Sequence, residues 1–162
     1  MADPIVIIGL AASIIQLADL SAKLSVKLFS VSKQIKSAPR TYEALSQEVA
    51  ITSTVLRQLG NELKDHNQHR IYRPAAVSTT ETLITECQSI FGELTEIAEP
   101  KVKKDAGGAA KALAEWKHRL KLPYKEADIA TKRARLEQLK SSLNVLLNVL
   151  MLAAQVKAYD KG

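Results

Sequence analysis

The sequence predicts an all-α protein: a helical bundle of four long helices plus one short helix, in a single domain over residues 1–162. Apolar residues recur at spacings of three and four along four long segments, which is the spacing of one helix face. The chain has only six Gly and five Pro, and β-branched residues alternate with polar ones over no strand-length run. Apolar residues make up 46% of the chain, which is enough for a core and argues against wholesale disorder.

The first helix is predicted from Pro4 to about Lys36, because proline suits the first turn of a helix. Its early half is apolar on nearly every side, and Asp19 is the one charge between Asp3 and Lys23. Its later half is amphipathic, and the predicted core face consists of Leu17, Leu20, Leu24, Leu28, Val31 and Ile35.

The second helix is predicted to start at Pro39, which disfavours helix at the residue before it. Its predicted core face consists of Tyr42, Leu45, Val49, Thr52, Leu56, Leu59 and Leu63. The third helix is predicted to begin at a capping box formed by Ser78 and Glu81 and to end at Pro100. Its predicted core face consists of Leu83, Cys87, Ile90, Leu94 and Ile97.

A short helix is predicted over residues 109–120, and a last long helix from Lys125 to Tyr159. The core face of that last helix should hold Leu136, Leu139, Leu143, Leu146, Leu150 and Ala153. No charged residue lies between Leu143 and Val156. The first and last helices are therefore both apolar nearly all round, and we expect them to pack on each other in the middle of the bundle.

Residues 4–22 are almost long and apolar enough to span a bilayer, which takes about 20 mostly apolar residues. Asp19 lies near one end, where a charge costs less than at mid-membrane. The segment is predicted to be a buried bundle helix that can also enter a membrane. The membrane-insertion candidates are Ile5, Val6, Ile7, Ile8, Leu10, Ile14, Ile15 and Leu17.

The start of the chain does not match a secretory signal, because an acid stands where a basic region would be expected. Cys87 is the single cysteine, so no internal disulfide can form, which fits a reducing compartment. We expect a cytoplasmic protein that is membrane-associated on activation.

The net charge of +6 belongs almost entirely to residues 101–140, which hold twelve basic and five acidic residues. Three interpretations are open for this stretch: a solvated helix face, a surface for anionic membrane lipids, or a nucleic-acid site. Nucleic acid is the least favoured partner, since aromatic residues are only 4% of the chain and few bases could stack. The anionic-surface candidates are Lys101, Lys103, Lys104, Lys117, Arg119, Lys121, Lys125, Lys132, Arg133 and Arg135.

No catalytic, cofactor-binding or metal-binding site is predicted. His66 and His69 have a metal-like spacing, but no second pair of ligands accompanies them. Cys87 lies on a predicted core face without a neighbouring base, so we interpret it as a buried apolar residue and not as a nucleophile.

The sequence resembles the N-terminal domains of fungal STAND (NLR-like) signalling proteins, in the HeLo-like group. The resemblance covers nearly the whole chain. It rests on the opening run from Asp3 to Asp19, on Lys36-Ser-Ala-Pro-Arg, Leu45-Ser-Gln-Glu-Val and Leu56-Arg-Gln-Leu59, on Trp116-Lys-His-Arg-Leu-Lys-Leu-Pro-Tyr-Lys-Glu, and on the run from Leu136 to Leu143.

This resemblance implies a non-enzymatic helical domain that acts in programmed cell death, with an N-terminal helix that binds or permeabilises membranes after oligomerisation. The alternative is a helical adaptor that binds partner helices, or copies of itself, and does not touch lipid. The sequence leaves both hypotheses open.

Overall fold

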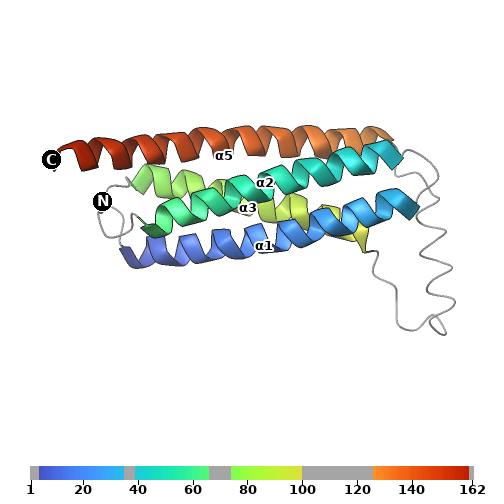
Figure 1. The fold of residues 1–162 in the computed structure, drawn as a ribbon, viewed down its shortest axis with the longest axis horizontal. Coiled ribbons are helices and arrows are strands. Elements are labelled where there is room, and N and C mark those ends of the chain that lie inside the picture. The colour runs from blue at the N-terminus through green and yellow to red at the C-terminus, as the bar shows by residue number, and fades with distance from the viewer. Residues whose placement is uncertain (1–3, 35–38, 66–73, 100–125, 161–162) are drawn as a thin grey trace.

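The computed structural model describes residues 4–34, 39–65, 74–99 and 126–160 (Figure 1). These residues form four long helices: α1 (Pro4–Gln34), α2 (Pro39–Asp65), α3 (Pro74–Ala98) and α5 (Glu126–Asp160). The predicted all-α bundle of four long helices is confirmed. The predicted short helix, residues 109–120, lies outside the described residues.

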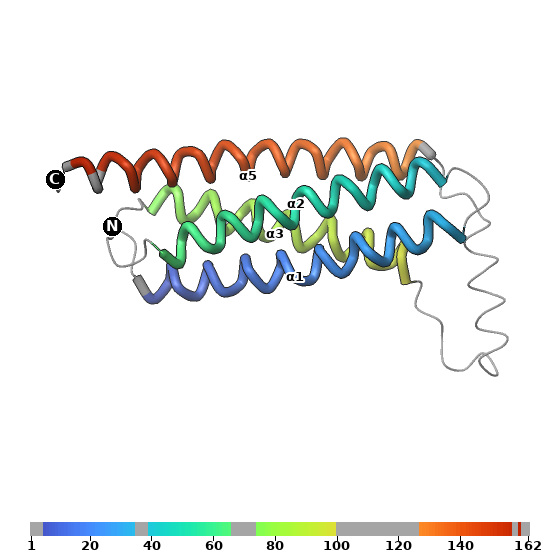
Figure 2. Tube along the Cα trace, in the orientation of Figure 1, coloured from blue at the N-terminus to red at the C-terminus, as the bar shows by residue number. Residues whose placement is uncertain are grey.

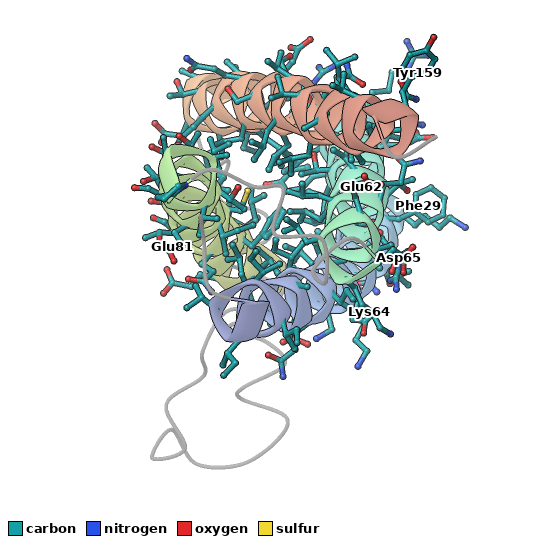
Figure 3. The ribbon with its side chains drawn as sticks, turned by 90° about the vertical axis from the view of Figure 1, so that its left-hand side faces the viewer. Phe29, Glu62, Lys64, Asp65, Glu81 and Tyr159 are labelled. Carbon is teal, nitrogen blue, oxygen red and sulfur yellow. The ribbon has the colours of Figure 1, made fainter. Side chains whose placement is uncertain are left out.

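The four helices lie along one common axis, and α2 and α5 run in the opposite direction to α1 and α3 (Figure 1). Seen end-on, they occupy the corners of a square (Figure 3). α2 and α3 each contact both α1 and α5, whereas α1 and α5 lie on a diagonal and do not contact each other through their backbones. The prediction that the first and last helices pack on each other is therefore wrong. The two amphipathic helices, α2 and α3, separate them and supply the apolar faces against which each is buried.

α1 and α2 pack together along most of their length. Gly60 of α2 allows this close approach, because a Cβ atom added there would lie 2.7 Å from Cγ1 of Ile15 and 3.4 Å from the carbonyl oxygen of Ala11. The core face predicted for α2 is confirmed throughout. Thr52 is fully buried on it, and its hydroxyl donates to the carbonyl oxygen of Glu48 at 2.8 Å.

Ile35, the last residue predicted for the core face of α1, lies outside the described residues, and among the described positions the face differs from the prediction at one. Leu20 is 61% exposed, and Ser21 is buried in its place. The buried face runs through Leu17, Ser21, Leu24 and Leu28, with alternating spacings of four and three. A serine can occupy this place because its hydroxyl donates to the carbonyl oxygen of Ala18 at 2.9 Å.

α3 begins earlier than predicted. It starts at Pro74, so Ser78 lies inside the helix and does not cap it. The carbonyl oxygen of Ser78 instead accepts a hydrogen bond from the hydroxyl of Thr82 at 3.1 Å. Proline is favoured in a first turn, and buried Val77 anchors the additional turn to the core.

α5 begins at Glu126, and its C-terminal end extends past the ends of the other three helices (Figure 2). The predicted core residues Leu136, Leu139, Leu143, Leu146 and Leu150 are all buried. Ala153, the last residue predicted for this face, is only partly buried. The bundle thus ends near that residue, and α5 continues beyond it.

Candidate membrane-contact site

The structure divides the eight membrane-insertion candidates into three groups. Ile7, Ile14 and Leu17 are buried in the core, and Leu10 and Ile15 are partly buried. Ile5, Val6 and Ile8 are exposed, by 77%, 45% and 51%. This apolar tip, formed by Ile5, Val6 and Ile8, occupies the first turns of α1.

The rest of the outward surface of α1 is mixed. Asp19 and Lys27 are both exposed there, and each forms an ion pair, Asp19 with a residue of α2 and Lys27 with the residue that follows α3. Arg57 of α2 donates from Nη2 to the Asp19 carboxylate at 2.7 Å, and Lys27 Nζ lies 2.6 Å from Glu99. Three exposed apolar residues, Leu20, Val26 and Phe29, lie among these charges. The uninterrupted apolar surface of α1 is therefore confined to its tip.

The end of α2 lies beside the start of α1. Lys64 and the α1 residues Ile8, Ile15 and Asp19 line one groove of about 450 Å³. Figure 3 looks at this end of the bundle and shows Lys64 together with Asp65 at the corner between α2 and α1. Lys64 is a basic residue beside the tip that the sequence analysis missed. If the first two helices are assumed to pair antiparallel, the end of the second helix meets the start of the first, and Lys64 is then expected beside the tip.

The basic candidates do not join the apolar tip. Only Lys132, Arg133 and Arg135 lie in the described part of the chain; the other seven fall outside it. These three belong to the early part of α5, toward the opposite end of the bundle from the tip (Figure 1). Lys132 Nζ and Arg135 Nη1 lie 3.1 and 3.5 Å from the same oxygen of Glu93, so that carboxylate offsets part of their charge.

Among the described helices, two segments, Ile5–Gln34 and Ala127–Val156, are long and apolar enough to cross a membrane by length and composition. In the most apolar stretch of each, 33% and 28% of the residues are buried in the bundle. The same properties also occur in the core helices of soluble bundles. Their composition therefore permits association with a membrane without requiring it.

A second exposed apolar surface runs along α5. It consists of Val145, Val149, Leu152, Val156 and Tyr159, which are between 53% and 87% exposed. We call this surface the α5 stripe. Figure 3 shows Tyr159 projecting away from the bundle. Val145 and Val149 also line a groove between α3 and α5.

Cys87 is fully buried in α3, as predicted. Desolvation by burial, with a smaller contribution from the nearby charge of Glu86, raises the pKa of its thiol to about 12. At neutral pH this thiol is therefore protonated, which is the state of a structural cysteine and not of an activated nucleophile. His66 and His69 lie outside the described residues. Within the four described helices, no group of three His, Cys, Asp or Glu side chains has the arrangement of a metal site.

Comparison with known protein families matches residues 2–160 to the family described as pigment biosynthesis cluster protein PigL N-terminal. No curated protein and no solved structure shows a significant match. The HeLo-like and STAND assignment is more specific than this finding and stays a prediction. Because the match covers nearly the whole sequence, the chain belongs to the PigL N-terminal family.

Proposed function

We propose that this domain is a non-enzymatic signalling or effector domain that contacts a membrane through the apolar tip of α1. The observation that carries the proposal is the exposure of Ile5, Val6 and Ile8 at one end of the bundle. These side chains can enter a bilayer surface while the buried face of α1 stays in the core. Burying an exposed isoleucine or valine stabilises a complex by about 1–3 kcal/mol, so three such residues suffice for reversible binding.

Full insertion of α1 is a second, more costly step. It would remove Ile7, Ile14, Leu17 and other buried residues of α1 from the core. Exposing each to water costs roughly 1.5–3 kcal/mol, so the sum is comparable with the stability of a whole domain, about 5–15 kcal/mol. We infer that α1 leaves the bundle only where lipid covers these residues as they emerge.

Anionic lipids are the membrane partner that we propose, with a modest contribution from charge. Lys64 lies beside the tip, but Asp65 follows it in sequence, and the Asp19 carboxylate is paired with Arg57. The Lys132 and Arg135 side chains are at a distance from the tip and share Glu93. Apolar contact should therefore supply most of the binding free energy, and attraction to anionic headgroups the smaller part.

The resemblance to HeLo-like domains supports a more specific role. We propose that this is a cytoplasmic domain that acts at membranes in programmed cell death. The family name connects a relative with a pigment biosynthesis cluster. Within such a cluster we propose a targeting or signalling role for this domain and not a catalytic one. The buried, protonated Cys87 supports this view, since it is unsuited to nucleophilic attack.

Vesicle flotation tests the proposal. The 162-residue chain is mixed with phosphatidylcholine vesicles that contain increasing fractions of phosphatidylserine. We expect the protein to float with the vesicles, and Ile5→Glu or Ile8→Glu to weaken partitioning by roughly tenfold or more, because a charge must then enter the interface. Lys64→Gln should lower only the additional binding that phosphatidylserine causes.

Val26→Glu is the matched control. Val26 is 68% exposed on the same helix but lies nearer its other end, so this variant should bind vesicles like the unmodified chain. Circular dichroism should show all variants folded, since each changed side chain is exposed. A folded chain that stays in the unbound fraction at every lipid composition would exclude the membrane function and leave the adaptor hypothesis.

The adaptor hypothesis is favoured by a different observation, the α5 stripe and the groove beside it. A continuous apolar stripe on one helix is a common docking surface for another helix. We therefore propose α5 as the helix through which a partner helix would bind.

A further inference from the structure

The α5 stripe has the spacing of a coiled-coil seam. Its residues Val145, Val149, Leu152, Val156 and Tyr159 follow one another at intervals of four, three, four and three. This seam is separate from the buried one through Leu143, Leu146 and Leu150. A bundle helix normally carries polar residues on its second side, so a regular apolar seam there indicates contact with another helix.

The other described helices of the same chain leave much of this seam uncovered. The C-terminal end of α5 extends past the other described helices (Figures 1 and 2). Leu152, Val156 and Tyr159 are 61%, 53% and 87% exposed.

A groove of about 640 Å³ adjoins the other end of the seam, between α3 and α5. Its α3 side begins with the small residues Ala75, Ala76 and Thr79. Val145 and Val149 line its α5 side and belong to the stripe as well. The groove is thus a continuation of the seam and has room for a large side chain.

We propose that the α5 stripe pairs with the α5 stripe of a second copy of this chain, antiparallel and centred on Leu152. Val145 and Tyr159 are each seven residues from Leu152, or about 10 Å along the helix. In this arrangement Tyr159 lies against the partner's Val145 and enters the partner's groove beside Ala75 and Thr79. Two-fold symmetry repeats the contact, so both projecting ends are covered and both grooves are filled.

The chemistry of the surface favours a second copy over a bilayer. Residues 141–156 contain no charged side chain, so two copies meet without like-charge repulsion. Helices that lie on membranes usually carry Lys and Arg beside their apolar face, whereas Asn144, Asn148 and Gln155 accompany this one. The stripe exposes on the order of several hundred Å², and with the groove it approaches the ~800 Å² per partner of an ordinary specific interface.

This inference goes beyond the proposed membrane function. It concerns α5, which lies diagonally opposite α1, and it does not depend on lipid binding by the apolar tip. The two can therefore fail separately.

Sedimentation velocity of the 162-residue chain over a concentration series tests the dimer. We expect a concentration-dependent dimer, and we expect Val145→Glu to raise its dissociation constant by at least about tenfold. Val26→Glu is the matched control, because it makes the same substitution at a residue of similar exposure. The side chains of Val26 and Val145 are 68% and 63% exposed. The control should dimerise like the unmodified chain, and circular dichroism should show both variants folded.

Cysteine cross-linking tests the antiparallel geometry. Cys87 is buried, so a cysteine introduced on the stripe is the accessible thiol. Under mild oxidation, Leu152→Cys should form a disulfide-linked dimer. A mixture of Val149→Cys and Val156→Cys chains should form mainly mixed dimers, whereas a parallel pair would link like chains.

Three results would overturn the proposal. The first is a chain that stays monomeric up to about 100 µM, well above the micromolar dissociation constants of weak specific interfaces. The second is a dimer that survives Val145→Glu, and the third is cross-linking of like chains alone. A monomeric chain whose vesicle binding is lost on Val145→Glu would assign the stripe to lipid instead.

Discussion

At the scale of single residues, the close approach of α1 and α2 depends on Gly60. Glycine in a helix costs up to about 1 kcal/mol relative to alanine. Gly60 is buried against Ile15 and the backbone of Ala11, whereas a Cβ at Gly92 of α3 would meet open space, with nothing within 4 Å beyond its chain neighbours and the nearby backbone of its own helix. The two glycines therefore have opposite roles, although they look alike in the sequence.

We expect Gly92→Ala to stabilise the protein by about 0.5–1 kcal/mol, through helix propensity alone. Gly60→Val should destabilise it by about 1–3 kcal/mol, because a branched side chain must displace Ile15 or separate the helices. Urea unfolding measures both changes. A Gly60→Val protein as stable as the unmodified one would show that α1 and α2 can move apart freely.

Burial of Cys87 should make the protein less stable as the pH becomes alkaline. Burial raises the pKa of its thiol to about 12 from 9.0, so between these values the unfolded chain loses a proton that the folded chain keeps. The stabilisation is complete below pH 9 and is lost as the pH rises toward 12, with a slope of up to about 1.4 kcal/mol per pH unit. Unfolding at several pH values should show a shallower decline for Cys87→Ala than for the unmodified chain. Equal slopes of unfolding free energy against pH for the two proteins would contradict the burial of the Cys87 thiol.

At the scale of the elements, ion pairs join the helices with different strengths. Lys140 of α5 and Glu48 of α2 lie 3.0 Å apart, and their side chains are only 18% and 16% exposed. The Asp19–Arg57 pair between α1 and α2 is about half exposed. Water therefore screens the second pair far more than the first.

A comparison of double-mutant cycles should separate the two pairs. Replacing Glu48 by alanine should cost about 1–3 kcal/mol, because the Lys140 ammonium stays largely buried without its partner. The coupling energy of Lys140 with Glu48 should exceed that of Asp19 with Arg57, which we expect below about 1 kcal/mol. Similar couplings in chemical unfolding would mean that burial at the α2–α5 contact does not strengthen the pair.

At the scale of the whole molecule, α1 forms one corner of the square and supplies part of the core, including Ile7, Ile14 and Leu28. Deleting residues 1–20 should therefore expose the faces of α2 and α3 that α1 covers. We expect the shortened chain to lose its cooperative thermal transition and to aggregate. A shortened chain that melts as sharply as the full one, at the same temperature, would show that the first turns of α1 lie on the surface and do not contribute to the core.

The sequence by itself determined the helical class, the start of α2 at Pro39 and most of the buried faces, because apolar residues at spacings of three and four define one side of a helix. Such spacing does not say which helix covers that side. The tertiary structure decided that α1 and α5 lie on a diagonal, that Ser21 is buried in place of Leu20, and that Lys64 lines the same groove as Ile8. It also decided which apolar residues remain outside. The apolar first half of α1 and the apolar second half of α5 each bury one face against amphipathic neighbours, and the tip of α1 and the α5 stripe remain exposed.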